Sequence, residues 1–120
     1  MGRAIEVVAY AQAAYFALTG VWPLVHVRSF MAVTGPKVDV WLVRTISVLV
    51  TVVGVVIAMA AWRGMVSPEV AVLAVGCAAG LAAVDVIYVV RRVIPPIYLA
   101  DAAAEGVLIA AWAVAWFGRG

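Results

Sequence analysis

The chain has 120 residues, of which 68% are hydrophobic and 12% are charged. Soluble domains average about 45–50% apolar and about 25% charged residues, so this composition excludes an ordinary soluble domain and indicates an integral membrane protein. The formal net charge of +2 does not indicate nucleic-acid binding, because the basic residues lie at the predicted membrane edges. One cysteine, Cys77, excludes an intrachain disulfide and a cysteine-based metal site, and one histidine adds too few ligands for a zinc site.

Four apolar stretches predict membrane-spanning helices over about 7–27, 40–62, 70–90 and 97–117, all within one transmembrane domain, 1–120. Each stretch, at ~1.5 Å of rise per residue, is long enough to cross about 30 Å of hydrocarbon. The first carries no formal charge and is too long for the apolar region of a cleavable signal, so we expect it to stay as a helix. The predicted fold class is therefore an all-α membrane protein, a bundle of four transmembrane helices.

Turn signals separate these spans. Thr34-Gly35-Pro36-Lys37 follows the first span, Ser67-Pro68-Glu69 precedes the third with a capping serine and an early proline, and Pro95-Pro96 precedes the fourth. The connection over 28–39 reads as a loop, and Trp22-Pro23 predicts a break near the end of the first span. Short connections place both chain termini on one side of the membrane and the first and third connections on the other. The basic residues are too evenly divided to fix the orientation.

Charged residues inside three of the spans are the strongest functional feature. Arg44 lies in the second span, Asp85 in the third, and Asp101 and Glu105 in the fourth. All four lie toward the side of the first and third connections. A charge within the hydrocarbon costs roughly 2.5–3.5 kcal/mol on insertion scales, so such residues mark functional or paired positions. We therefore expect a shared polar site near one membrane face.

Spacing along the helices extends this set. Asp85, Tyr88 and Arg92 are three and seven residues apart, and Asp101 and Glu105 are four apart, so each group is predicted to share one helix face. His26 follows the Trp22-Pro23 break at the same side. The predicted ligand-binding residues are His26, Arg44, Asp85, Tyr88, Asp101 and Glu105. No catalytic residue or cofactor is assigned, and no metal site is expected without more histidines or cysteines. His26 as a haem ligand has no second axial residue within the chain, although a methionine or a second copy of the chain could supply one.

The charge balance leaves two interpretations open. Arg44 is permanently charged, so we expect it to pair with one or two of the carboxylates, either to fix the helix register or to face a ligand. The remaining acids could be compensated by Arg28, Arg91 or Arg92 reaching inward, or by a protonated His26. Alternatively, an acid could hold its proton, or a cationic ligand could enter. Gln12, Tyr15 and Tyr10 in the first span are interpreted as partners in hydrogen bonds between helices rather than as substrate contacts.

Two weaker patterns concern packing. Each half of the chain reads as a helical hairpin with basic residues, a proline, an aromatic residue and then a charge, so two parallel hairpin repeats would place Arg44 and Asp101 at equivalent depths. Three pairs of small residues four apart allow close approach of helices: Gly54-x-x-x-Ala58, Gly76-x-x-x-Gly80 and Ala102-x-x-x-Gly106. These pairs either close the bundle or form a dimer.

The four-span layout across nearly the whole chain, with charged residues at the helix ends, resembles the DoxX-like group of small four-helix bacterial membrane proteins. The resemblance rests on layout and not on a diagnostic motif. It implies a bacterial protein of the inner (plasma) membrane.

Three functional hypotheses follow. In the first, which we favour, Glu105, Asp101 and Asp85 bind or transport a small polar-headed or cationic amphiphile in a polar pocket near one membrane face. In the second, a membrane enzyme acts on a lipid-like substrate with His26 or Glu105 as general acid or base and Arg44 orienting an anionic group. In the third, the chain is an accessory subunit of a larger membrane complex. The expected partners are the lipid bilayer, an amphiphilic ligand, and copies of the chain or a larger complex.

Overall fold

A computed structural model of the chain describes residues 2–35 and 39–118. These residues form five helices and no strand: α1 (Gly2–Val25), α2 (Val27–Thr34), α3 (Val40–Trp62), α4 (Pro68–Val90) and α5 (Tyr98–Phe117). By length and hydropathy, α1, α3, α4 and α5 are able to cross a membrane. The predicted all-α protein with four membrane-spanning helices is confirmed. The first candidate span, Arg3–Val25, begins and ends earlier than the predicted 7–27.

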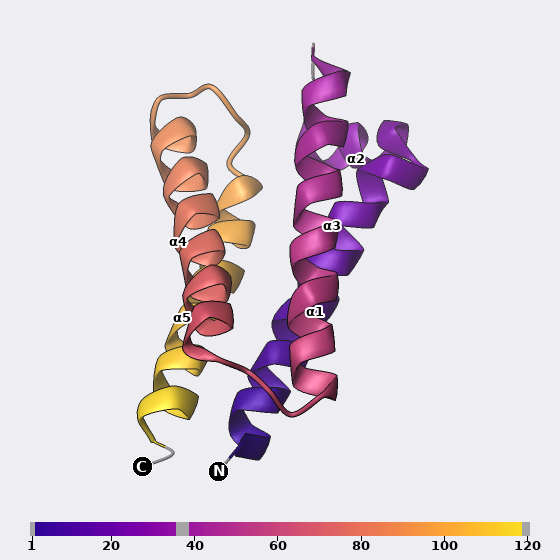
Figure 1. Cartoon of the computed structure of the whole chain (residues 1–120). Helices are drawn as coiled ribbons and strands as arrows, with labels where there is room; N and C mark the ends of the chain where they lie inside the picture. The colour runs from indigo at the N-terminus through magenta and orange to yellow at the C-terminus, as the bar shows by residue number, and fades with distance from the viewer. Residues whose placement is uncertain (1, 36–38, 119–120) are drawn as a thin grey trace.

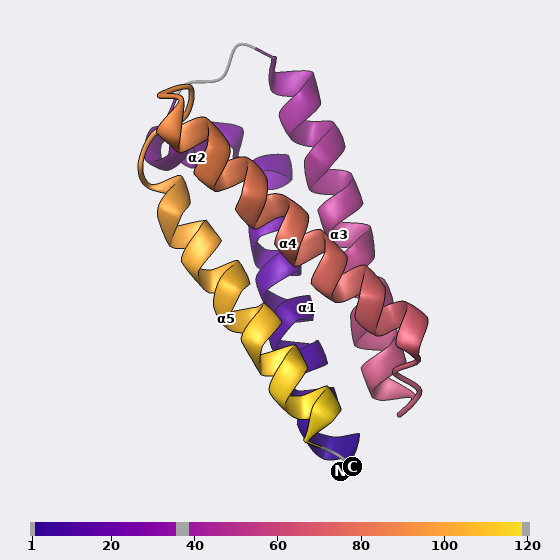
Figure 2. The same cartoon turned by 90° about the vertical axis from the view of Figure 1, so that its left-hand side faces the viewer.

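The four long helices alternate in direction, and this sets the two ends of the molecule. Both chain termini and the connection from α3 to α4 lie at one end, while α2 and the turn from α4 to α5 lie at the other (Figures 1 and 2). We call these the terminal end and the α2 end. This arrangement confirms the predicted distribution of connections. At the terminal end Ser67 caps α4, as predicted, by accepting a hydrogen bond from the Val70 N–H at 3.2 Å.

The first connection contains a short helix that the sequence analysis read as a loop. The α1 helix continues through Pro23 to Val25, so the predicted break at Trp22-Pro23 is wrong and the chain changes direction at His26 instead. There the His26 Nδ1 accepts a hydrogen bond from the Ser29 N–H at 3.1 Å and caps α2. The Trp22 indole N–H donates to the Ser29 Oγ at 2.8 Å. These local hydrogen bonds give the segment a helical start that apolar periodicity did not reveal.

The long helices form two pairs that meet through α1 (Figures 1 and 2). The α3 helix packs along α1, α4 packs along α5, and α1 also contacts α5, whereas α3 and α4 make few contacts with each other. The α1 and α3 helices approach each other closely at two glycines. A Cβ atom added at Gly20 would lie 3.0 Å from the Thr51 backbone nitrogen, and one at Gly54 would lie 3.1 Å from the Phe16 Cβ. Only residues without a side chain allow this spacing.

The buried core is small and lies toward the terminal end. It combines small and branched residues of all four long helices with the ring of Trp112, which is 1% exposed. Elsewhere the long helices expose apolar side chains, including Leu18, Val72 and Val114 at 71–74%. In water such a surface would be unfavourable, but hydrocarbon chains cover it without cost. The exposed apolar surface therefore agrees with a protein embedded in a bilayer.

Candidate functional site

Three acidic residues lie close together where α4 ends and α5 begins. The chain reverses direction over residues 91–97, so the last turns of α4, with Asp85, lie beside the first turns of α5, with Asp101 and Glu105. The side chains of Asp85 and Glu105 are only 6% and 1% exposed, and Asp101 is half-buried. We call Asp85, Asp101 and Glu105 the carboxyl triad. Its more exposed member, Asp101, lies nearest the α2 end of α5.

Asp101 is the centre of the carboxyl triad. Its Oδ1 accepts a hydrogen bond from the hydroxyl of Tyr15 on α1. The carboxyl groups of Asp85 and Glu105 lie close enough to that of Asp101 to interact with it electrostatically. Like charges that are this close disfavour the fully ionised state. The triad is therefore stabilised when a proton or a cation offsets part of its charge.

Two carboxyl oxygens of the triad lack a partner. Asp85 Oδ2 and Glu105 Oε1 are buried and accept no hydrogen bond from the described residues. A buried polar atom left without a partner costs ~1–3 kcal/mol. The triad consequently offers acceptor positions to a proton donor or to a cation.

Arg44 does not join the triad. It is exposed on α3, and neither a hydrogen bond nor an ion pair connects it to another described residue. The expectation that Arg44 pairs with one or two of the carboxylates is wrong. The physical reason is the helix arrangement: α3 packs along α1, and α1 in turn contacts α5, so Arg44 belongs to a helix that does not pack along α5.

The other predicted residues lie outside the triad. His26 is exposed and uses its Nδ1 to cap α2. Tyr88 is 39% exposed on α4, and Arg92 lies beyond the end of α4 in the turn to α5. The predicted common helix face does not extend to Arg92, because α4 ends at Val90; Asp85 and Tyr88 both lie within α4, but only Asp85 is buried. A ligand role for His26, Arg44 and Tyr88 stays a prediction.

The proposed repeat places Arg44 and Asp101 at matching positions, and both do lie in the first turns of helices that begin at the α2 end. Their surroundings differ, since Asp101 contacts α1 and Arg44 is exposed. The repeat itself stays a prediction.

A second polar contact lies deeper in the protein, on the terminal side of the triad. Gln12 is fully buried on α1, where its Oε1 accepts a hydrogen bond from the Trp112 indole N–H at 2.7 Å. Its Nε2 donates to the Ala74 carbonyl on α4 at 2.8 Å. One side chain thus joins α1 to both α4 and α5. The predicted hydrogen bonds between helices are confirmed for Gln12 and Tyr15, whereas Tyr10 is 42% exposed.

Tyr15 belongs to the site, although it was not among the predicted ligand-binding residues. The sequence pattern could have identified Tyr15. In a span without formal charge, Tyr15 and Thr19 follow Gln12 by three and seven residues, so the three side chains form one polar face of α1. What the spacing did not show was that this face is turned toward α4 and α5.

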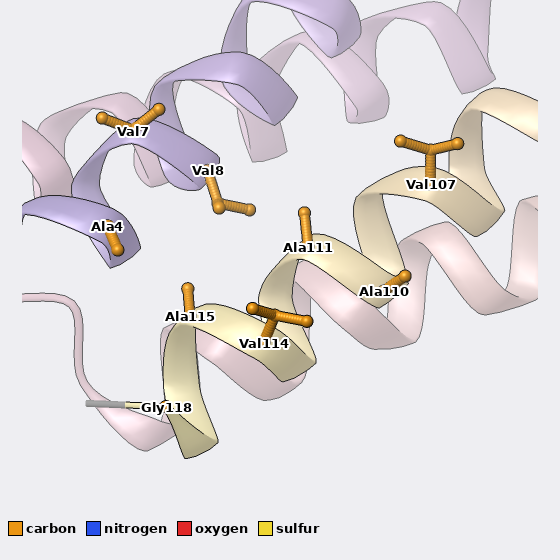
Figure 3. Close-up of a pocket in the computed structure, with 9 residues that line it drawn as sticks. All are labelled: Ala4, Val7, Val8, Val107, Ala110, Ala111, Val114, Ala115 and Gly118. Atoms are coloured by element: carbon orange, nitrogen blue, oxygen red, sulfur yellow. The ribbon is translucent and has the colours of Figure 1, made fainter. Parts of the chain in front are cut away.

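Two apolar grooves lie outside the triad. One, with a volume of about 880 Å³, runs between α1 and α5, with Val8 and Ala111 on its two walls (Figure 3). The other, of about 440 Å³, lies between α4 and α5 and includes Trp112 and Trp116. Neither groove is lined by the carboxyl triad. The polar pocket expected at the acids therefore stays a prediction.

Comparison with known proteins gives no relative: no family model, no curated protein and no solved structure matches the chain. The resemblance to DoxX-like proteins and the bacterial inner-membrane location that it implies stay predictions.

Proposed function

We propose that this integral membrane protein binds or transports a small cationic or polar-headed amphiphile at the carboxyl triad, near one face of the membrane. The observation that carries the proposal is the pair of buried, unpartnered oxygens, Asp85 Oδ2 and Glu105 Oε1, beside a third carboxyl group. Among the described residues no basic side chain pairs with any of the three.

A cation is favoured by electrostatics. Buried carboxylates are stable only when they are paired, hydrogen-bonded or protonated. Since Arg44 does not supply the positive charge, protons or an entering cation must do so. The same oxygens would accept either, so a bound cation would displace protons from the triad. This competition is the physical basis for coupling cation binding to proton release.

The surroundings favour an organic cation over a metal ion. Among the described residues, no group of three His, Cys, Asp or Glu side chains is arranged to hold a metal ion. Near the triad, α4 and α5 expose apolar side chains such as Val84 and Leu99, at 50% and 44%. In a bilayer these side chains contact lipid, so a cation with an apolar body would reach the triad from the membrane.

The test is binding of a lipophilic cation to the purified protein in non-ionic detergent. Tetraphenylphosphonium is titrated by calorimetry in weak buffer, with a pH indicator to detect proton release. We expect wild-type protein to bind and to release protons, and Glu105→Gln to lower the affinity by about tenfold or more, which is roughly 1.4 kcal/mol. Glu69→Gln is the matched control, because Glu69 is an exposed acid in the first turn of α4.

Equal binding by wild type and Glu105→Gln would contradict the proposal, as would equal binding of uncharged triphenylphosphine oxide. Native mass spectrometry of the same two proteins would identify a retained ligand directly. We expect a small molecule on the wild type that is lost from Glu105→Gln.

A role as a subunit of an oligomer or a larger membrane complex draws on a different observation. A Cβ atom added at Gly76, Gly80 or Gly106 would meet nothing within 4 Å, so these small residues point away from the chain's other helices. Faces of this kind allow close contact between helices in membranes. In a Cys77→Ser background, Gly80→Cys would form a disulfide-linked dimer in membranes if α4 faces its own copy. For the enzyme hypothesis, the His26 Nδ1 is engaged in capping α2, so Glu105 is the remaining candidate for a general acid or base.

A further inference from the structure

A separate pocket lies at the α2 end, where the chain turns from α4 to α5. It has a volume of about 490 Å³ and is bounded by Gly35, which follows α2, and by residues of the turn, including Arg92, Pro95 and Pro96. None of the carboxyl triad lines it. The pocket is therefore distinct from the proposed cation site.

Arg92 has an unusual backbone in this pocket. Its φ of 60° lies in the left-handed region that glycine adopts most easily. The Arg92 N–H donates to the Val89 carbonyl at 3.0 Å and the Val93 N–H donates to the Tyr88 carbonyl at 2.8 Å, which is the hydrogen-bond pattern of a Schellman helix ending. The left-handed position of this motif is usually glycine. An arginine there costs about 1 kcal/mol or more, and such strain is typical of functional positions.

The α2 end carries more arginines than the terminal end, and it also holds Asp39 and the carboxyl triad. Among the described residues, Arg28, Arg44, Arg91 and Arg92 lie there and all are exposed, against Arg3 and Arg63 at the terminal end. Neither Arg91 nor Arg92 makes a side-chain hydrogen bond or ion pair with another described residue. Guanidinium groups at a membrane surface bind phosphate through paired N–H donors.

The apolar residues of the pocket favour a phosphate carried by a lipid over free phosphate. Val89, Val93 and Ile94 line it together with Arg92. Val90 and Val93 are 73% and 66% exposed beside it, where acyl chains would lie in a bilayer. Free phosphate would make no favourable contact with these apolar side chains, whereas acyl chains would. We propose that this pocket binds the phosphate of an anionic phospholipid headgroup through Arg92, with Arg91 beside it.

The test compares lipid binding to delipidated protein by native mass spectrometry, with phosphatidylglycerol and phosphatidylcholine as probes. We expect phosphatidylglycerol to bind more tightly. Arg92→Asn should lower its affinity by about fivefold, the effect of one basic residue near an anionic surface. Asparagine tolerates the left-handed backbone, so this variant removes the charge while keeping the turn. Arg92→Gly is a second variant with the same expectation and no backbone strain.

Arg63→Asn is the control, because Arg63 is an exposed arginine at the terminal end. Its affinity for phosphatidylglycerol should equal that of the wild type. An equal loss in Arg63→Asn and Arg92→Asn would overturn the proposal in favour of general charge attraction. Wild-type affinity in both Arg92→Asn and Arg92→Gly would overturn it as well. Displacement of the lipid by millimolar inorganic phosphate would assign the pocket to free phosphate instead.

Discussion

The hydroxyl of Tyr15, in the middle of α1, donates a hydrogen bond to Asp101, in the first turn of α5, across 86 positions of the sequence. This bond connects the charge-free first span to the acids of the last one. It also means that the carboxyl triad is held by a neutral donor from α1 and not by the arginine of α3.

A double-mutant cycle should detect the bond between Tyr15 and Asp101. Hydrogen bonds to charged groups contribute about 1.5–3 kcal/mol in water-soluble proteins, whereas bonds between membrane helices average about 0.6 kcal/mol. We expect a coupling energy of about 0.5–1.5 kcal/mol between Tyr15→Phe and Asp101→Leu, in which no acceptor remains, measured by unfolding in mixed detergent micelles. Additive effects of the two substitutions would show that the hydrogen bond does not contribute.

Gln12→Leu should destabilise the protein. Leucine keeps the volume but leaves the Trp112 indole N–H without its acceptor and removes the bond to the Ala74 carbonyl. Two lost contacts between membrane helices correspond to a loss of about 1–3 kcal/mol in the free energy of unfolding. Tyr10→Phe is the control and should change stability little, because Tyr10 is exposed on the same helix. Wild-type stability of Gln12→Leu would contradict the role of Gln12 as a link among three helices.

Substitutions at Glu105 and Arg44 distinguish a ligand site from a structural ion pair. Removing one partner of a buried ion pair strands the other charge and costs about 3–5 kcal/mol. Because Arg44 is exposed and unpaired among the described residues, we expect Arg44→Gln to change stability by less than about 0.5 kcal/mol. Glu105→Gln should keep or raise stability while weakening cation binding. Thermal unfolding in detergent measures the stability of the two variants. A large loss of stability in both Arg44→Gln and Glu105→Gln would restore the ion-pair interpretation.

The glycines of the four spans should fall into two classes. Gly20→Ala should cost about 1–3 kcal/mol, because the new Cβ would lie 2.5 Å from the Thr51 Oγ1 and 3.0 Å from the backbone nitrogen of the same residue. Gly76→Ala has open space and should be neutral or stabilising by up to about 1 kcal/mol, the gain in helix propensity. Unfolding of the monomer in detergent provides the comparison. A loss for Gly76→Ala that depends on protein concentration would place that face in an oligomer.

The pattern of apolar residues was sufficient to predict the helices that cross the membrane. Their number, their order and the common end of the two termini follow from apolar length, because a chain in hydrocarbon must satisfy its backbone hydrogen bonds within each helix. The same reasoning failed for α2, whose start depends on local bonds of His26 and Ser29 that apolar periodicity does not record. The spacing of Asp101 and Glu105 likewise predicted that the two acids share a helix face.

Which helices face one another was decided only by the tertiary structure. Inside a membrane the hydrophobic effect does not favour one arrangement of apolar helices over another, so close packing and hydrogen bonds decide. Here the glycine contact of Gly20 and Gly54 holds α3 against α1, and Gln12 and Tyr15 hold α1 against α4 and α5. The sequence alone determined which span carries each charged residue. Their surroundings depend on distances between helices, and for this reason Arg44 is exposed while Asp85 and Glu105 are buried without a basic partner among the residues described.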